Sequence, residues 1–353
     1  MGKKYKILMT TMGLNIGGAE THIVELSKEL KKRGYDVSVA SNGGVYVDEL
    51  TQAGIKHYNV PLNTKNIAKV LTSLRLLRKI ISEEKIDIVH SHARIPGFIT
   101  GILHHSMDFT FVTSAHWVFN TSNGLKYLTN WGQKVIAVSE DIKQYLMDNY
   151  NTKEKDIYVT INGIDTDKFS PDVSGEEIIK EFSLDSSHPI VSYVSRMDED
   201  RAMVAEQLID CAELISEEID GVQFLIAGGG NVFDRLKAKA DIVNEKLGRQ
   251  CVVMTGARTD INKIVAAGDI FVGVSRAALE AMSAEKPVIV AGNEGYIGIF
   301  SEDKLPVAQE NNFCCRGCEM SRGELLIRDV TALLKAGDNE RKSLGEYGRS
   351  VIF

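Results

Sequence analysis

The sequence predicts an α/β protein with two doubly wound, Rossmann-like parallel-sheet domains. Short aliphatic and β-branched runs alternate with amphipathic segments of helical spacing, which is typical of parallel sheets covered by helices. This alternation stops at a polar stretch, Asn162–His188, and then starts again. The chain has 353 residues, whereas a single hydrophobic core rarely grows beyond roughly 250–300 residues.

The first half is expected to contain up to seven strands and four helices. Apolar residues recur every three or four positions in the helical segments, which places them on one helix face. The expected strands are Tyr5–Thr10, Asp36–Ala40, Lys56–Val60, Ile86–His90, Thr110–Ala115, Lys134–Val138 and Ile157–Ile161. The expected helices are Ala19–Lys32, Val47–Ala53, Ile67–Ser82 and Gly97–His104.

The second half repeats the pattern with five strands. They are Pro189–Ser195, Val222–Ala227, Cys251–Thr255, Ile270–Val274 and Pro287–Ala291. The expected helices are Met203–Glu217, Asp234–Leu247, Asp260–Ala267 and Ala277–Ala284. We therefore predict an N-terminal domain over residues 1–168 and a C-terminal domain over residues 169–353.

Composition excludes several classes of protein. The chain carries 41 basic and 48 acidic residues, a net charge of -7, which argues against a nucleic-acid-binding protein. No apolar run approaches the roughly 18 residues of a membrane span, and the N-terminal apolar run is too short for a signal peptide. The odd number of cysteines, five, favours a reducing compartment, so a cytoplasmic protein is expected.

Two clusters could hold a metal. Cys314, Cys315 and Cys318 lie close together in the sequence, but no fourth cysteine or histidine is near, so a structural or incidental role is favoured over a metal or redox role. His90 and His92 would share one face of an extended chain. A metal there is the weaker alternative because no carboxylate pattern accompanies them, and no metal is predicted.

Loops that follow strands deserve the closest reading, because ligands of parallel sheets bind outside the carboxyl ends of the strands. Gly17 and Gly18 follow the first strand and open a helix, whose free N–H groups can bind a phosphate or a sugar hydroxyl. The loop does not match Gly-x-Gly-x-x-Gly, so a nicotinamide site is not supported. A plain tight turn is the alternative.

Basic residues follow the first strand of the second half. Arg196 and Arg201 could hold a pyrophosphate and stabilise its charge as it leaves. Because Asp198–Asp200 separate them, solvated surface charge is the alternative.

Further candidates follow two other predicted strands. Ser275 is a plausible N-cap, and Glu280, one turn later, could accept hydrogen bonds from a ribose diol; a nearby arginine or a backbone N–H is the alternative partner. His116 follows the strand Thr110–Ala115 and could donate to a sugar hydroxyl or a phosphate. A structural histidine is the alternative there.

Taken in order, these segments resemble the family-4 retaining glycosyltransferases of GT-B architecture, in which two Rossmann-like domains face a central cleft. The likeness extends from about Tyr5 to Ala291. It rests on Gly17–Glu20, Ala137–Ser139, Asn162–Asp165 with Phe169 and Pro171, Ser195–Arg196, Leu279–Met282 and Lys286–Ile289.

The resemblance implies a nucleotide-diphosphate-sugar donor on the C-terminal domain and a glycan or lipid-linked acceptor on the N-terminal domain. It places the Gly18 backbone beside the donor phosphate, His116 on the transferred sugar and the Glu280 carboxylate on the ribose. Arg196, with Arg201, would bind the diphosphate. Front-face attack would retain the anomeric configuration, with the leaving diphosphate taking the acceptor proton, and neither a metal nor a cofactor is implied.

The sequence departs from the family pattern at three places. Arg201 stands where the family usually has a lysine, and Val272 stands where the first glutamate of Glu-x7-Glu is expected. Backbone N–H groups of Arg276 and Ala277 could take the phosphate instead. The final helix, within residues 334–353, also looks incomplete. These departures leave two alternatives open, a transferase-like subunit without catalytic activity and a sugar-nucleotide epimerase on the same fold.

The predicted helix Ile67–Ser82 is basic as well as amphipathic. Such a helix can lie on an anionic membrane, where lipid-linked acceptors reside. Its alternative is a helix packed on the sheet with a solvated basic face. Peripheral contact with the inner face of the membrane through Ile67–Ser82 is therefore one expectation. The basic residues on or beside the helix are Lys65, Lys69, Arg75, Arg78 and Lys79.

Overall fold

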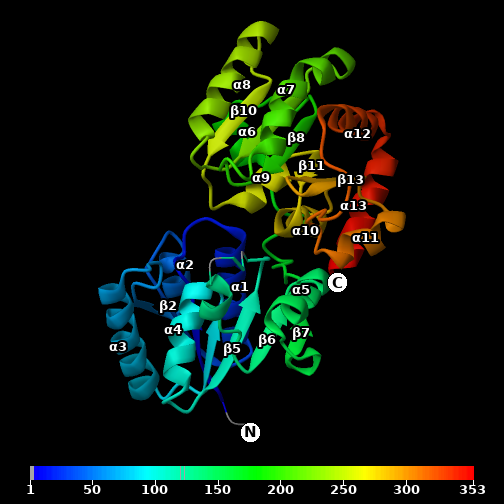
Figure 1. The fold of residues 1–353 in the computed structure, drawn as a ribbon. Coiled ribbons are helices and arrows are strands. Elements are labelled where there is room, and N and C mark those ends of the chain that lie inside the picture. Colours follow the sequence, from blue (N-terminus) through cyan, green and yellow to red (C-terminus); the bar gives the residue numbers. More distant parts are fainter. Residues whose placement is uncertain (1–3, 120, 123) are drawn as a thin grey trace. The chain divides into compact units, whose positions relative to one another are not determined.

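The computed structural model describes residues 4–119, 121–122 and 124–353. The chain divides into two compact units, with unit 1 ending at Gly163 and unit 2 beginning at Ile164 (Figure 1). The sequence placed this boundary five residues later, between residues 168 and 169. Each unit is a mainly parallel sheet with helices on both faces, so the predicted fold class is confirmed.

Unit 1 contains a seven-stranded, entirely parallel sheet. Its order is β3-β2-β1-β4-β5-β6-β7, so the direction of strand addition reverses between β1 and β4. The strands are β1 (Lys6–Thr10), β2 (Asp36–Ser41), β3 (Lys56–Asn59), β4 (Ile88–Ser91), β5 (Thr110–Ala115), β6 (Lys134–Ala137) and β7 (Ile157–Val159).

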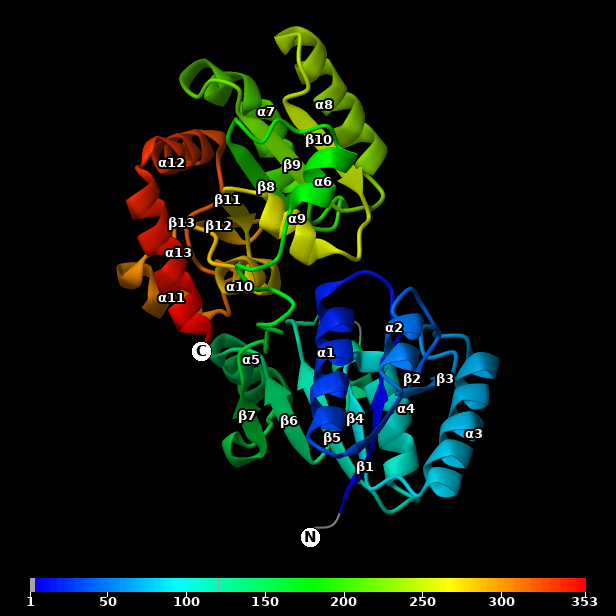
Figure 2. The same cartoon turned by 180° about the vertical axis from the view of Figure 1, so that it is seen from behind.

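Helices cover both faces of this sheet because its strands bury both sets of side chains. In β1, Ile7 and Met9 pack with residues of α1 and α2, whereas Leu8 packs with residues of α3 and α4. Figures 1 and 2 show these two helix pairs on opposite faces. The helices are α1 (Gly18–Lys32), α2 (Val47–Gln52), α3 (Ile67–Glu84), α4 (Arg94–His104) and α5 (Glu140–Tyr150), with short 3-10 turns η1 (Leu125–Leu128) and η2 (Glu154–Asp156).

Unit 2 contains a six-stranded sheet of order β10-β9-β8-β11-β12-β13, which reverses between β8 and β11. The last strand pairs antiparallel with β12 through a hairpin, in which Gly292 is opposite Gly295. Sequence analysis missed this strand because its two glycines, Gly295 and Gly298, interrupt the apolar run. The strands are β8 (Ile190–Val194), β9 (Gln223–Ala227), β10 (Val252–Gly256), β11 (Ile270–Gly273), β12 (Val288–Gly292) and β13 (Gly295–Ile299).

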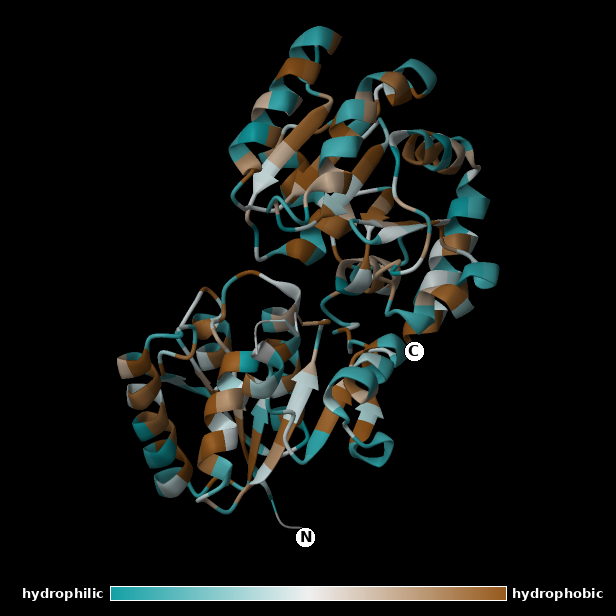
Figure 3. Cartoon of the chain, viewed as in Figure 1, coloured by the Kyte–Doolittle hydropathy of each residue, from teal (hydrophilic) through white to brown (hydrophobic). Residues whose placement is uncertain are grey.

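Alternate residues of the unit 2 strands again face different helices. Val272 packs with the α7, α8 and α12 cluster, and Phe271 packs with the α10 cluster on the other face. Figure 3 shows these strands as hydrophobic between helices of mixed polarity. The helices are α6 (Glu176–Glu181), α7 (Met203–Glu218), α8 (Phe233–Leu247), α9 (Ile261–Ala267), α10 (Ser275–Ser283), α11 (Leu305–Glu310), α12 (Gly323–Lys335) and α13 (Asp338–Ile352), with the 3-10 turn η3 (Glu302–Lys304).

Helix α13 lies within residues 334–353, where the sequence predicts the final helix. It packs against α10 within unit 2, and its Tyr347 stacks on Phe300, with ring centroids 5.8 Å apart. This packing stabilises the helix that carries Glu280.

Candidate functional site

The candidate residues lie at comparable places in the two sheets. Loops diverge where the strand order of a doubly wound sheet reverses, and ligands bind there, outside the carboxyl ends of the strands. Gly17 and Gly18 follow β1, and His92 follows β4, which are the two strands that flank the reversal in unit 1. In unit 2, Arg196 follows β8 and Arg276 follows β11, which flank the second reversal.

The glycine pair starts α1, as predicted. Gly17 precedes the first turn, and its carbonyl accepts hydrogen bonds from the backbone N–H and the hydroxyl of Thr21, both at 2.9 Å. A Cβ atom placed on Gly18 would meet nothing within 4 Å. The protein's own packing therefore does not require glycine at this position.

Four imidazoles gather at the same edge of unit 1. His22 lies in α1, one turn after Gly18, His90 belongs to β4, and His92 and His116 directly follow β4 and β5. His92 Nδ1 lies 3.2 Å from His116 Nε2. The ligating nitrogens of His22, His92 and His116 all lie within 4.8 Å of one another. His22 was missed, although its place one helical turn after the glycines was a signal.

His90 and His92 are buried and neutral. Burial lowers the pKa of His90 to about 3, with a further contribution from repulsion by His116. Burial also lowers the pKa of His92 well below its ordinary value, and the three neighbouring imidazoles add to the effect. His90 Nε2 lies 2.8 Å from Ser114 Oγ, so a hydroxyl satisfies this buried ring.

The two predicted arginines of unit 2 are half-exposed, and each has a long contact with a nearby aspartate. Arg196 Nε lies 3.7 Å from Asp198 Oδ2, and Arg201 Nε lies 3.7 Å from Asp200 Oδ2. Exposed ion pairs of this kind stabilise a protein by about 0–1 kcal/mol. A ligand anion could therefore replace the Asp198 carboxylate beside Arg196 at little cost.

A glycine loop that sequence analysis overlooked supports Arg196. Gly228 has a φ of +148°, and a Cβ atom on it would lie 1.7 Å from the Ser195 carbonyl oxygen. A Cβ atom on Gly230 would lie 2.3 Å from the Met197 carbonyl oxygen. Only glycine permits this close approach. The run of three glycines after a predicted strand was the available signal.

The start of α10 differs from the expectation for Ser275. Val274 precedes the helix and makes no side-chain cap, whereas Ser275 is the first helical residue, with a φ of +52°. The predicted N-cap role of Ser275 is therefore wrong. Its backbone N–H donates to the Phe313 carbonyl at 2.8 Å, while Arg276 and Ala277 continue the first turn.

Glu280 has the partner that the sequence gave as its alternative. Arg276 Nε donates to Glu280 Oε1 at 2.8 Å, and both side chains are more than nine-tenths buried. A carboxylate has about four acceptor sites, so Glu280 can accept more than one hydrogen bond. Val272 is completely buried in β11, so no polar contact replaces the missing first glutamate at that position.

The cysteines do not form a metal centre. All five are free thiols, and burial raises the pKa of Cys315. Over residues 4–119, 121–122 and 124–353, the one group of three potential metal ligands close enough for one ion is His22, His92 and His116.

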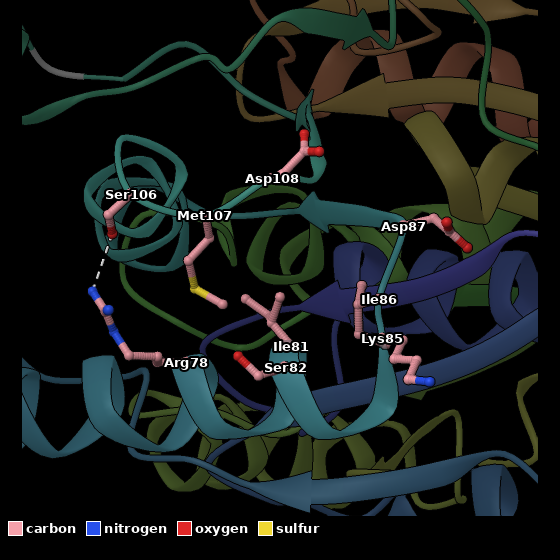
Figure 4. Close-up of a pocket in the computed structure, with 9 residues that line it drawn as sticks. All are labelled: Arg78, Ile81, Ser82, Lys85, Ile86, Asp87, Ser106, Met107 and Asp108. Atoms are coloured by element: carbon pink, nitrogen blue, oxygen red, sulfur yellow. Dashed lines mark hydrogen bonds between the residues drawn. The ribbon is translucent and has the colours of Figure 1, made fainter.

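A hollow of about 520 Å³ in unit 1 lies away from the candidate site (Figure 4). Asp87 and Asp108, which precede β4 and β5, lie on its wall, and Arg78 donates to Ser106 Oγ at 3.1 Å there. The hollow is therefore at the amino ends of the strands, and none of the residues predicted to bind the donor or to act in catalysis lines it.

Helix α3 packs on the sheet, as one of the two interpretations expected, and contact with a membrane stays a prediction. Leu77, Ile80 and Ile81 are buried against unit 1, whereas Ile67 and Leu71 are 77% and 61% exposed. The exposed apolar residues lie in its first turns, and Lys65 and Lys69 are near them in the sequence. None of the helices in the described residues is both long enough and sufficiently apolar to span a bilayer.

Comparison with known proteins finds glycosyltransferases for both halves of the chain. The sequence model described as Glycosyltransferase Family 4 matches residues 16–168, and the one described as Glycosyl transferases group 1 matches residues 188–312. EpsD of Bacillus subtilis, provisionally named a glycosyltransferase, is 25% identical over 92% of this chain and 86% of its own length.

Two further proteins are similar over most of the chain. UDP-Gal:alpha-D-GlcNAc-diphosphoundecaprenol alpha-1,3-galactosyltransferase of Escherichia coli is 24% identical over 83% of this chain and 80% of its own length. The crystal structure of a glycosyltransferase from Rickettsia africae superposes with a TM-score of 0.78 at 24% identity, covering 99% of this chain and 94% of that one.

Proposed function

Because the chain belongs to the family-4 glycosyltransferases, which transfer sugars from nucleotide-sugar donors, we propose that it is a retaining, metal-independent enzyme that uses a nucleoside-diphosphate sugar. The proposal rests above all on the residues that flank the strand reversal of unit 2. The half-exposed Arg196 follows β8 there, and the buried pair of Arg276 and Glu280 follows β11.

In this proposal, unit 2 binds the nucleotide diphosphate. Arg196 exchanges its weak contact with Asp198 for the diphosphate, and Arg201 adds a second planar cation. The glycine loop at Gly228 holds the Arg196 segment in place. Glu280 accepts hydrogen bonds from the ribose, and the N–H groups of Arg276 and Ala277 contact phosphate oxygens at the start of α10.

Unit 1 then supplies groups for the transferred sugar and the acceptor. The backbone of Gly18 approaches the donor, and His116 contacts a sugar hydroxyl. As the glycosidic bond breaks, negative charge develops on the leaving diphosphate, and the arginines stabilise it without a metal. The diphosphate takes the acceptor proton on the face from which it leaves, so the anomeric configuration is retained.

The acceptor in this proposal is a glycan or a lipid-linked sugar. The similar E. coli galactosyltransferase acts, by its name, on a diphosphoundecaprenol-linked sugar. Exposed Ile67 and Leu71, flanked by Lys65 and Lys69, could rest on an anionic bilayer that carries such an acceptor. Flotation with phosphatidylglycerol vesicles tests this contact: Ile67→Ser/Leu71→Ser should lower the bound fraction, and Leu214→Ser, which changes an exposed residue of unit 2, should not.

A panel of uridine, guanosine and adenosine diphosphate sugars tests the proposed donor. Ligand that binds the native state raises the melting temperature according to ln(1 + [L]/Kd). We expect diphosphate sugars of one base to raise the melting temperature clearly. In a separate activity assay, we expect EDTA to leave sugar transfer intact. No shift with any member would contradict the proposal.

The alternative of a non-catalytic subunit is favoured by one observation, the apolar Val272 at the position of the missing glutamate. Product analysis separates the two. If the protein binds a donor but neither transfers its sugar nor slowly hydrolyses it, the result would support a non-catalytic subunit.

A further inference from the structure

The imidazoles of unit 1 have a spacing that suits a metal ion. A tetrahedral zinc with Zn–N bonds of about 2.0–2.1 Å holds its nitrogens about 3.3–3.4 Å apart. His92 Nδ1 and His116 Nε2 are 3.2 Å apart, and His22 completes a set within 4.8 Å. Rotation of the His22 ring toward the other two would bring all three nitrogens onto one ion.

We propose that His22, His92 and His116 form a binding site for one zinc-class cation. The three residues come from α1 and from the ends of β4 and β5. These elements belong to the same packed unit, so the ligands are held close together before an ion arrives.

The ligand chemistry selects the class of ion. Three neutral nitrogens suit Zn²⁺, Cu²⁺ or Ni²⁺, whereas Mg²⁺ and Ca²⁺ prefer oxygen ligands. His92 is buried, but His22 and His116 are half-buried, which lets an ion enter from solvent and keep water as a fourth ligand. A site of three histidines with one open position is a common zinc arrangement.

The surroundings of His92 determine which of its nitrogens faces the site. His92 Nε2 lies 3.4 Å from the sulfur of Met9, so its other nitrogen, Nδ1, is the one that faces the site. One proton lies between His92 Nδ1 and His116 Nε2 when the ion is absent. On binding, this proton moves through solvent to the outer nitrogen of the same ring, and the ion takes its place.

Occupancy has a consequence that rests on the proposed function. The ion would take the His116 nitrogen that a sugar hydroxyl needs. Excess Zn²⁺ should therefore inhibit transfer, and EDTA should restore it. Zinc binding without inhibition would leave the site intact and contradict the role of His116.

Calorimetry of the full chain with ZnCl₂, and the visible absorption of bound Co²⁺, test the site without measuring activity. We expect one ion per chain and a strong four-coordinate Co²⁺ spectrum. His22→Gln should weaken binding at least about 10–100-fold, since even outer-shell changes cost that much. His116→Gln provides a second variant if His22→Gln lowers the melting temperature.

Two control variants exclude other zinc ligands. His188→Gln changes a histidine of unit 2, and Cys314→Ser/Cys318→Ser removes the two partly exposed thiols. Both should keep the affinity of the wild type. Zinc binding that survives His22→Gln and His116→Gln, or that disappears with the cysteines, would overturn the proposal.

Discussion

The two units place their candidate residues at equivalent points of similar sheets, yet they present different chemistry. The strand reversal of unit 1 carries imidazoles, of which His90 and His92 are neutral, and a glycine, Gly18, that faces open space. The strand reversal of unit 2 carries guanidinium groups and a carboxylate. The fold thus places the candidate residues, and their side chains differ in the ligands they suit: charged groups suit an anion, and neutral rings suit an uncharged ligand.

The units also support their candidate residues differently. In unit 2, the helix that carries Glu280 depends on a buried ion pair and on packing against α13. In unit 1, neutral buried rings and a hydroxyl contact such as His90 to Ser114 hold the edge of the sheet. Stability should therefore respond to lost charge in unit 2 and to added protons in unit 1.

The largest effect is expected from Glu280→Ala in unit 2. This change leaves Arg276 buried without its carboxylate, which typically costs about 3–5 kcal/mol. Urea unfolding followed by circular dichroism measures the loss. Arg235→Ala removes an exposed ion pair with Glu206 and should cost at most about 1 kcal/mol.

The double variant Arg276→Met/Glu280→Leu sharpens the same test. Replacing both charges by apolar groups should recover most of the stability, because no charge stays buried alone. If the double variant is folded and still binds the nucleotide normally, Glu280 does not hold the ribose. Failure to recover stability would mean that the pair matters for another reason.

A smaller effect, on catalysis, is expected from Arg196→Ala. Loss of one donor to developing charge costs about 2.7–4 kcal/mol of transition-state stabilisation, or roughly 10²–10³ in kcat. Steady-state kinetics should show kcat falling more than the donor KM rises, since the contact strengthens as the diphosphate leaves. Equal changes in kcat and in the donor KM would mean that Arg196 binds the donor equally well before and during the reaction. Arg235→Ala provides the matched control.

The imidazoles of unit 1 should make its stability depend on pH. The pKa of His90 falls from 6.5 unfolded to about 3 folded, so the unfolded chain binds the proton more strongly. The contribution of neutral His90 to the free energy of unfolding is fully present above pH 6.5 and is lost as the pH falls toward 3. At pH 5 the loss is about 2 kcal/mol.

Unfolding free energies of wild type and His90→Gln at pH 7 and pH 5 measure this dependence. The variant should lose less stability on acidification, because glutamine cannot take the proton. His105→Gln, which changes an exposed histidine directly after α4, is the control. Identical slopes in wild type and His90→Gln would show that His90 is not buried in the neutral form.

The sequence predicted the sheets well because their strands bury both faces and alternate regularly with helices. It placed Arg196, Arg276 and His116 after the correct strands for the same reason. It missed β13, whose glycines break the strand signal, and it assigned Ser275 to a cap that the φ of +52° does not allow. Local patterns do not reveal such a backbone conformation.

Contacts between distant segments were harder to predict. His22 lies seventy residues before His92 in the chain, and only the packing of α1 on the sheet brings their nitrogens together. Gly228 depends on Ser195 in the same way, through the pairing of β8 with β9. By contrast, the Arg276–Glu280 pair is four residues apart on one helix, and the sequence could anticipate it.

The smallest effect on stability, and the sharpest test of unit 1, is expected from Gly18→Ala. A methyl group at this position meets nothing within 4 Å, and alanine favours a helix over glycine, so stability should rise by a few tenths of a kcal/mol, up to about 1. If the Gly18 backbone approaches the donor, the same methyl group should lower kcat/KM. Thermal unfolding and kinetics on one sample separate the two effects.

Gly163→Ala is the control, because its added methyl group also meets nothing within 4 Å. Unchanged kinetics in Gly18→Ala would show that the glycine only begins a helix, and unit 1 would then rely on its imidazoles alone.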